Sequence, residues 1–250
     1  MLALDFDGVI ADSSNECLVT AHNTYSRYLG AYDPRYNLEH FDQALLEKFH
    51  QTRPLIRRGE DFVYLLQAIH AGVDLNLQQD FDDFVANYTD RREQYREIFY
   101  LEREKFQRAY PAEWLGLNKF YPGMVSFLKK RLVPGDTIIV TTKDIRSVGI
   151  LLEQYGVKFK SSNLFQATRE YRKPDIVNEI IKTRHWIAES SAFIDDHVAT
   201  VLEMAQNSQV RSYCAAWGYN TEEQRRNLDN KEISVIDLDQ FLNHFGGLKG

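Results

Sequence analysis

Residues 2–8 read LALDFDG, a short apolar run that is interrupted by two carboxylates and ends at a glycine. An apolar run of this length, followed by polar residues and Gly8, is typical of a buried strand that continues directly into a turn. Asp5 and Asp7 therefore lie at the carboxyl end of the expected strand. Gly8 permits a sharp backbone turn just beyond them.

The second half of the chain repeats this pattern of a strand followed by polar residues. Residues 137–140 (TIIV) are followed by Thr141, Thr142 and Lys143, and residues 192–194 (AFI) are followed by Asp195 and Asp196. Further extended segments are expected at 157–165, 210–216 and 234–236. Helices are expected at 123–132, 144–155, from Pro174 onward and from the two acids to residue 205. Alternating strands and helices predict an α/β fold with a Rossmann-like parallel sheet and right-handed crossovers.

Between the first strand and the second lies a long segment with helical texture and no strong β-branched runs. Ser13 and Glu16 have the spacing of a capping box at its start. Later in the segment, six aromatic residues repeat with alternating spacings of four and seven, which predicts a core-facing helical stripe with a charged outer face. The members of this stripe are Phe84, Tyr88, Tyr95, Phe99, Phe106 and Tyr110.

The length of the chain supports an insert. At about 150 residues per domain, 250 residues correspond to about 1.7 domains. A sheet that is left after one strand and resumed later gives a discontinuous core domain. We expect the core to comprise residues 1–13 and 120–250, and a helical cap domain to comprise residues 14–119.

Composition excludes several classes of protein. Thirty basic and thirty-six acidic residues give a net charge of −6, which does not suit a nucleic-acid-binding protein. No apolar run reaches the ~18–20 residues of a membrane-spanning helix. Cys17 and Cys214 are far apart and suggest neither a disulfide framework nor a metal site, so a cytoplasmic location is expected.

The polar strand ends should meet, because ligands of open α/β sheets bind at the carboxyl ends of the strands. Asp5, Asp195 and Asp196 offer the hard oxygen ligands that Mg²⁺ prefers. A carboxylate beside such an ion can attack phosphorus, and a second carboxyl, Asp7, can protonate the leaving alcohol. Lys173 and Thr141 can then hold the phosphoryl group by charge and by hydrogen bonding.

Four motifs in this order, DFDGV, IIVTT, RKPD and FIDD, resemble those of the haloacid dehalogenase-like hydrolases. The helical insert resembles the C1 cap of that superfamily, and the stretches at 121–124 and 216–219 resemble its phosphoglycolate phosphatase branch. The resemblance implies that Asp5 is the nucleophile and a Mg²⁺ ligand. It also implies that Asp7 is the acid/base and binds the metal through its backbone carbonyl, and that Asp196, helped by Asp195, completes the metal site.

The sequence departs from that branch at two motif positions. Thr142 stands where the branch usually has asparagine, and Thr200 stands four residues after Asp196 in place of another acid. The cap is also longer than usual. Dehalogenases of the superfamily lack the second aspartate, so the presence of Asp7 favours a phosphate ester as the substrate.

Other residues near these motifs are candidates for substrate binding. Thr142 and Lys143 follow the second strand, although Lys143 could instead be a helix-start side chain. Arg53 and Arg57, with Arg58 beside them, could bind a substrate carboxylate or a second phosphate, or form a solvated turn. The side chains interpreted as having no direct role in the chemistry are His197, Trp217 and Tyr219.

These observations predict a Mg²⁺-dependent phosphatase that acts on a small phosphorylated metabolite through an aspartyl-phosphate on Asp5. Two alternatives stay open, namely a phosphomutase of the same superfamily and a binding protein that keeps the fold without turnover. Neither a nucleic acid nor a membrane is expected as a partner. No zinc-binding or P-loop motif is present.

Overall fold

The computed structural model describes residues 1–132, 135–228 and 233–247. The chain divides into two compact units, one made of Met1–Asp12 with Phe120–Gly250 and the other of Ser13–Lys119. Ser13, which we had expected in the core, belongs to the second unit because helix α1 begins directly after it.

The core unit is built on a six-stranded parallel sheet in the order β5-β4-β1-β6-β7-β8. Its strands are β1 (Leu2–Leu4), β4 (Thr137–Thr141), β5 (Leu164–Gln166), β6 (Ala192–Asp195), β7 (Arg211–Ala215) and β8 (Ser234–Ile236). β1 lies between β4 and β6, and chain connections lead away from it in both directions along the sheet. This point of divergence is where a doubly wound sheet leaves room for a ligand.

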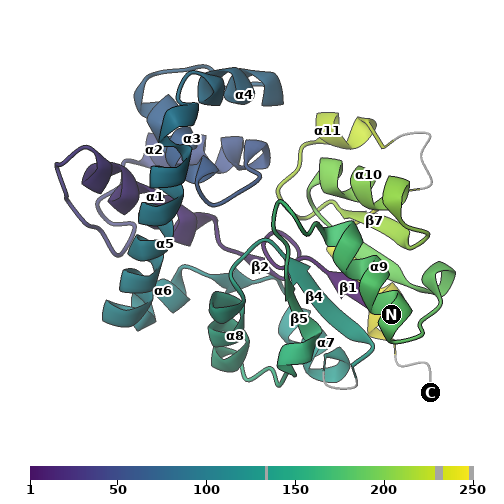
Figure 1. Ribbon diagram of the computed structural model, residues 1–250. Helices are drawn as coiled ribbons and strands as arrows, with labels where there is room; N and C mark the ends of the chain where they lie inside the picture. Colours follow the sequence, from purple (N-terminus) through teal and green to yellow (C-terminus); the bar gives the residue numbers. More distant parts are fainter. Residues whose placement is uncertain (133–134, 229–232, 248–250) are drawn as a thin grey trace. The chain divides into compact units, whose positions relative to one another are not determined.

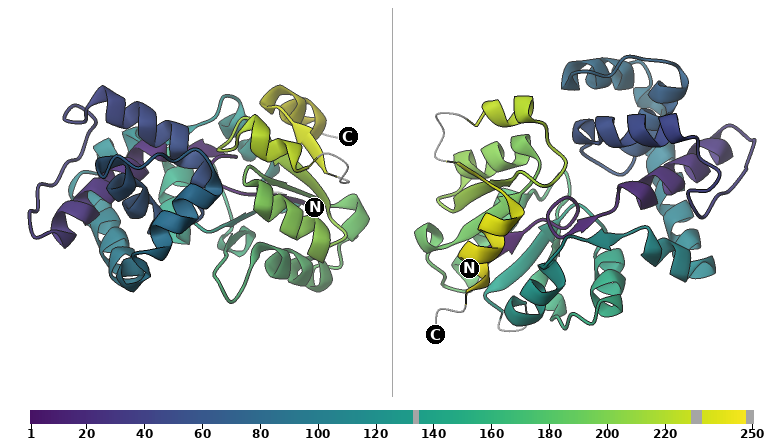
Figure 2. Two further views of the ribbon diagram at one scale, coloured as in Figure 1. Left: turned by 90° about the horizontal axis from the view of Figure 1, so that it is seen from above. Right: turned by 180° about the vertical axis from the view of Figure 1, so that it is seen from behind.

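Helices cover both faces of this sheet. They are α7 (Met124–Arg131), α8 (Ile145–Gln154), α9 (Lys173–Thr183), α10 (Val198–Asn207), α11 (Glu222–Arg226) and α12 (Leu238–Gly246). α9 and α10 pack on one face (Figure 1), and the view from behind in Figure 2 shows α12 in front of the other. The core under α9 and α10 buries apolar residues of the sheet and of these helices, among them Val140, Ile176 and Phe193.

Most of the expected strands and helices of the core are present, and one extended segment was wrong in its first part. Residues 157–160 form no strand and Ser161–Asn163 form a 3-10 turn (η3), so that β5 begins only at Leu164. Small polar side chains favour such turns because they bind nearby backbone groups. α11, α12 and the short 3-10 helix η4 (Ala188–Ser190) were not predicted.

The second unit consists of helices and connecting segments, and its last residue, Lys119, is the first residue of strand β3. Its elements are α1 (Ser14–Tyr28), α2 (Gln43–Thr52), η1 (Arg53–Leu55), α3 (Asp61–His70), α4 (Gln78–Ala86), η2 (Thr89–Arg91), α5 (Arg92–Ala109) and α6 (Pro111–Gly116). α1 packs against both α3 and α5. Where the chain passes between the units, β2 (Ala11–Asp12) and β3 (Lys119–Phe120) form a separate two-stranded sheet.

The aromatic stripe spans α4 and α5 and faces the interior for most of its length. Tyr95, Phe99 and Phe106 are fully buried, whereas Tyr110 at the end of α5 is 39% exposed. The expectation of a wholly solvated charged face was wrong at Arg103. This arginine is buried and forms a bidentate ion pair with Glu16. Glu16 therefore serves this pair rather than the predicted capping box.

Two findings concern expected absences. Among the described residues, no helix is long and apolar enough to cross a membrane. Cys17 and Cys214 are both buried, and neither is part of a disulfide.

Candidate active site

Sheet register brings the predicted carboxylates together. Leu4 of β1 is paired with Ile139 of β4 and Ile194 of β6, and the Asp5 backbone N–H donates to the Ile194 carbonyl at 2.9 Å. The next residue on each strand therefore lies at the same sheet edge. Asp5, Asp195 and Asp196 each place a carboxylate oxygen within 4.8 Å of the others, and all three side chains are buried.

Lys173, at the first turn of α9, lies between two of these acids. Its Nζ is 2.8 Å from Asp5 Oδ2 and 2.7 Å from Asp195 Oδ2. Burial by itself lowers the pKa of Lys173, but the carboxylates of Asp195 and Asp5 outweigh burial and raise the pKa above its usual value. This lysine stays charged at neutral pH and offsets part of the negative charge at the strand ends.

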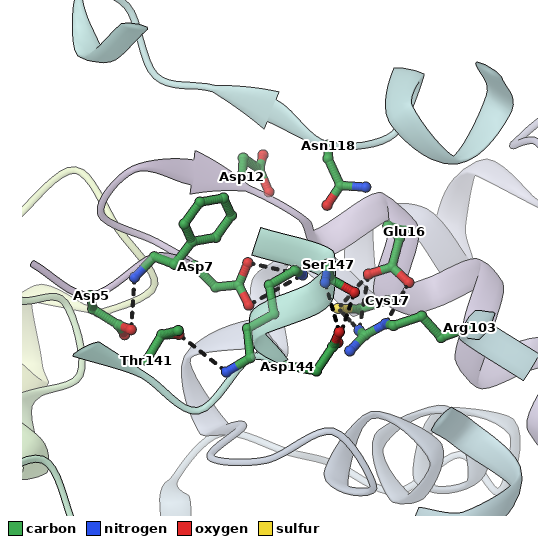
Figure 3. Close-up of polar contacts among 12 residues, drawn as sticks. Asp5, Asp7, Asp12, Glu16, Cys17, Arg103, Asn118, Thr141, Asp144 and Ser147 are labelled. Carbon is green, nitrogen blue, oxygen red and sulfur yellow. Dashed lines mark hydrogen bonds and ion pairs between the residues drawn. The ribbon is translucent and has the colours of Figure 1, made fainter. Parts of the chain in front are cut away.

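The Asp5 carboxyl is in an environment that disfavours its charge. Burial raises its pKa from 3.8 to about 6; the Lys173 ammonium opposes this shift, while Asp195 and Asp7 add to it. Asp5 Oδ1 accepts a hydrogen bond of 2.7 Å from the Phe6 backbone N–H (Figure 3). One oxygen is thus fixed by the following peptide and the other by an ammonium group.

Asp196 is held by the segment that follows β7. Its Oδ2 accepts from the Tyr219 backbone N–H at 2.6 Å, and its backbone carbonyl accepts from Asn220 Nδ2 at 2.9 Å. Two glycines make room for it. A Cβ on Gly8 would lie 2.2 Å from Asp196 Oδ2, and one on Gly218 would lie 2.3 Å from Asp196 Cβ.

The positive φ of Gly8, +85°, is accessible to glycine with little strain. Gly8 was expected to permit a turn; its second role, the close approach of Asp196, became clear only from the structure. Gly218 was noted only as part of the stretch at 216–219, and Asn220 was not singled out from the sequence. Their signal is their adjacency to the predicted strand end at 210–216, which is where ligand-binding loops of such sheets lie.

The donor set fits the divalent ion that the sequence predicted. Three buried carboxylates with converging oxygens, and no soft ligand among them, match the preference of Mg²⁺. Like charges brought this close also favour the binding of a cation. Asp5, Asp195 and Asp196 could therefore hold the ion, together with the backbone carbonyl of Asp7.

Lys143, a candidate substrate-binding residue, lies beside Asp7. Its side chain is completely buried, and its Nζ lies 3.2 Å from Asp7 Oδ1 and 3.4 Å from Asp7 Oδ2 (Figure 3). Its backbone N–H donates to Thr141 Oγ1 at 3.1 Å. Thr141 is buried at the end of β4, whereas the neighbouring Thr142 is exposed.

The stretch 216–219 does more than pack. Trp217 Nε1 donates to the Val9 carbonyl at 3.1 Å, and Tyr219 Oη donates to Asp12 Oδ1 at 2.7 Å. The interpretation of these two aromatic residues as packing residues was therefore incomplete. They tie the loop after β7 to the turn that follows the first strand.

Two residues that follow the fourth motif, His197 and Thr200, make local contacts. The His197 backbone N–H donates to Asp195 Oδ1 at 2.8 Å, and its ring Nδ1 lies 3.1 Å from Thr200 Oγ1. His197 is the N-cap residue of α10. Thr200, where the family pattern has an acid, thus supports the start of this helix.

The candidate substrate-binding arginines lie in the helical unit. Arg57 forms an exposed ion pair with Asp82 at 3.1 Å. The Arg53 guanidinium lies 4.8 Å from the centre of the Phe62 ring. Whether either arginine faces a substrate stays a prediction.

A parallel sheet that is wound in both directions and interrupted after its first strand by a helical insert is a doubly wound α/β fold with an inserted unit, and carboxylates lie at its strand ends. A scan against protein-family models finds no match, and neither does a search of the curated proteins. Solved structures do match over nearly the whole chain. One is a haloacid dehalogenase-like family hydrolase from Streptococcus pneumoniae, with a TM-score of 0.62 and 15% identity over 98% of this chain and 97% of that one.

Two further structures are similar at the same level. A predicted phosphoglycolate phosphatase from Haemophilus somnus has a TM-score of 0.61 and 14% identity, covering 98% of this chain and 96% of that one. A predicted phosphatase from Clostridium acetobutylicum has a TM-score of 0.55 and 14% identity, covering 97% and 96%. The chain therefore has the fold of the haloacid dehalogenase-like hydrolases, which confirms the predicted fold class.

Proposed function

We propose that the protein is a Mg²⁺-dependent phosphatase that hydrolyses the phosphoric monoester of a small metabolite through an aspartyl-phosphate on Asp5. The observation that carries the proposal is the meeting of Asp5 with Lys173 at 2.8 Å and with the two acids after β6. This combination supplies a nucleophile, a cation and oxygen ligands at one sheet edge. The predicted phosphatases among the structural neighbours share the fold, which supports the proposal. Fold alone does not establish function, so the proposal depends on the residues of the site.

The first half of the reaction is a transfer to Asp5. A carboxylate oxygen of Asp5 forms a bond to phosphorus while the bond between phosphorus and the ester oxygen breaks. The carboxyl of Asp7, two residues further on, gives its proton to the departing oxygen. Lys173 and the Thr141 hydroxyl are the groups that we expect to hold the phosphoryl oxygens during this step.

The second half restores the enzyme. Asp7, now a carboxylate, takes a proton from a water molecule whose oxygen attacks phosphorus, and the bond to Asp5 breaks to release inorganic phosphate. Mg²⁺, when bound by Asp5, Asp195 and Asp196, supplies positive charge to the phosphoryl oxygens throughout. Both halves use the same pair of aspartates, so removing Asp5 should stop turnover and removing Asp7 should slow it.

A screen over phosphorylated metabolites with Mg²⁺ tests the proposal, with p-nitrophenyl phosphate as a generic substrate. Asp5→Asn is expected to lower kcat at least about 10³-fold, because an amide cannot serve as the nucleophile. EDTA is expected to abolish activity in the unmodified protein. Asp239→Asn changes an exposed aspartate of α12 and serves as the matched control, with activity unchanged.

Two results contradict the proposal. Activity retained by Asp5→Asn excludes Asp5 as the nucleophile. Isomerisation of sugar phosphates without release of inorganic phosphate identifies a phosphomutase instead, since that enzyme returns the phosphoryl group to a substrate hydroxyl.

A further inference from the structure

The buried lysine at the end of β4 has a contact that the proposed chemistry does not yet use. Lys143 Nζ lies 3.2 and 3.4 Å from the two carboxylate oxygens of Asp7, and the lysine side chain is completely buried while that of Asp7 is 22% exposed. An ammonium group that meets both oxygens fixes the direction of a carboxylate more firmly than a single contact does. The partly exposed Asp7 is thereby tied to a buried anchor.

The loop around Lys143 is itself rigidly held. The Lys143 backbone N–H donates to Thr141 Oγ1 at 3.1 Å. On its other side, Asp144 caps α8 by accepting from the Ser147 backbone N–H and from Ser147 Oγ, each at 2.8 Å. A lysine stem buried between the end of a central strand and a capped helix has few alternative rotamers, so it can set the position of its partner.

The two buried lysines of the site have different partners. Lys173 contacts Asp5 and Asp195, whereas Lys143 contacts Asp7. The cation beside the nucleophile is therefore Lys173. Lys143 is placed to act on the substrate through the acid/base aspartate.

We propose that Lys143 is the positioning residue of Asp7: it holds the carboxyl in the orientation from which a proton reaches the leaving group. This inference rests on the proposed phosphatase function. It replaces direct substrate binding as the role of Lys143, and it makes a specific claim about which substrates depend on this lysine.

The effect of changing Lys143 should depend on whether the leaving group of the substrate needs a proton. p-Nitrophenolate is a stable anion that departs without protonation, whereas the alkoxide of glycerol 2-phosphate needs a proton from Asp7. General acid catalysis contributes about 10²–10⁴-fold where it operates. A residue that acts through Asp7 should affect kcat/KM for the alkyl ester and leave kcat/KM for the aryl ester nearly unchanged, since kcat/KM reports the steps up to leaving-group departure.

The experiment compares Lys143→Met with the unmodified full-length chain in Mg²⁺. We expect kcat/KM for glycerol 2-phosphate to fall about 10²-fold and that for p-nitrophenyl phosphate to change less than about 3-fold. Lys143→Arg, which keeps a cation, should recover part of the loss for the alkyl ester. Lys182→Met removes an exposed lysine of α9 and should leave both values unchanged.

A double variant provides the second readout. If Lys143 acts through Asp7, then Lys143→Met combined with Asp7→Asn loses no more activity on glycerol 2-phosphate than Asp7→Asn alone. Additive losses, or equal losses on both substrates, overturn the positioning role and show direct substrate binding or a general structural defect. Lack of hydrolysis by the unmodified protein overturns the proposed function instead, and this inference with it.

Discussion

The molecule buries charge in two places, and the two differ in how the charge is balanced. In the helical unit, Arg103 meets Glu16 through two hydrogen bonds of 2.9 Å (Figure 3), and Thr20 Oγ1 donates to Glu16 at 2.8 Å. The guanidinium also lies 4.7 Å from the centre of the Phe99 ring. This bidentate pair links helix α1 to helix α5.

In the core unit, four aspartates face two lysines in the described part of the site. Asp5 and Asp195 share Lys173, Asp7 faces Lys143, and Asp196 is bound by a backbone N–H. Burial raises the pKa of Asp5 to about 6 despite its lysine partner. Buried charge as such is therefore a weak sign of function; buried carboxylates whose oxygens converge within 4.8 Å of one another, as those of Asp5, Asp195 and Asp196 do, indicate a site that could hold a cation.

The balanced pair gives the largest expected effect on stability. Glu16→Gln removes the anion of this buried bidentate pair, and we expect a loss of about 3–5 kcal/mol in the free energy of unfolding. Urea denaturation followed by circular dichroism measures it. Glu104→Gln breaks an exposed pair with Arg108 on the same helix and should change stability by less than about 0.5 kcal/mol. Equal effects of the two changes contradict a structural role for the buried pair.

The carboxylate cluster of the core unit should show the opposite effect, so that removing a charge there raises the free energy of unfolding. In EDTA near neutral pH, Asp5→Asn is expected to stabilise the folded protein by up to about 3 kcal/mol. Ionising Asp5, whose pKa rises from 3.8 to about 6, costs folding free energy of about 1.4 kcal/mol per pKa unit. Asp5→Asn, which should remove the proposed activity, is thus expected to raise the free energy of unfolding. Such a trade-off is common where charged groups serve function at the expense of stability.

The pH dependence of this gain has a definite sign. Since the folded-state pKa of Asp5 is the higher one, its protonated form favours folding. That contribution is complete below the unfolded value of 3.8 and is lost as pH rises through about 6. The Tm difference between Asp5→Asn and the unmodified protein, measured in EDTA, should therefore open between these two values. A difference that does not vary with pH contradicts the burial of an ionised carboxylate.

The balanced and unbalanced clusters also differ in how visible they are in sequence. The four aspartates and Lys173 follow predicted strands, so the parallel topology was enough to bring them together. No local sequence pattern links Glu16 to Arg103, because the two residues are far apart in the chain. Glu16 instead had the spacing of a capping box with Ser13. Tertiary pairing overrode that local pattern.

Within the site, sequence reasoning reached residue types but not their partners. Lys143 was expected near the substrate because of its place after a strand, but its partner depends on side-chain direction, which sequence does not give. The roles of Gly218 and Asn220 depend on the loop after β7 returning over Asp196, which is again a tertiary property. The helix α12 was missed although Asp237 caps it, because the segment is short and terminal.

The smallest of the expected effects concerns the packing around the unbalanced cluster. Gly218→Ala adds a Cβ that would lie 2.3 Å from both Asp196 Cβ and the Gly8 carbonyl oxygen. Because one of these atoms is backbone, the loop must shift, and we expect a loss of about 1–3 kcal/mol in the free energy of unfolding. The shift also moves Asp196, so the proposed Mg²⁺-dependent activity should fall with it.

Gly149→Ala is the matched control for this change, since Gly149 lies inside α8 and its added Cβ meets Phe159 at an ordinary 3.5 Å. Alanine is favoured over glycine in a helix by up to about 1 kcal/mol, so this variant should gain stability and keep its activity. Thermal melting and Mg²⁺ titration of both variants measure the contrast. If Gly218→Ala melts and binds Mg²⁺ like the unmodified protein, then close approach of the backbone is not what places Asp196.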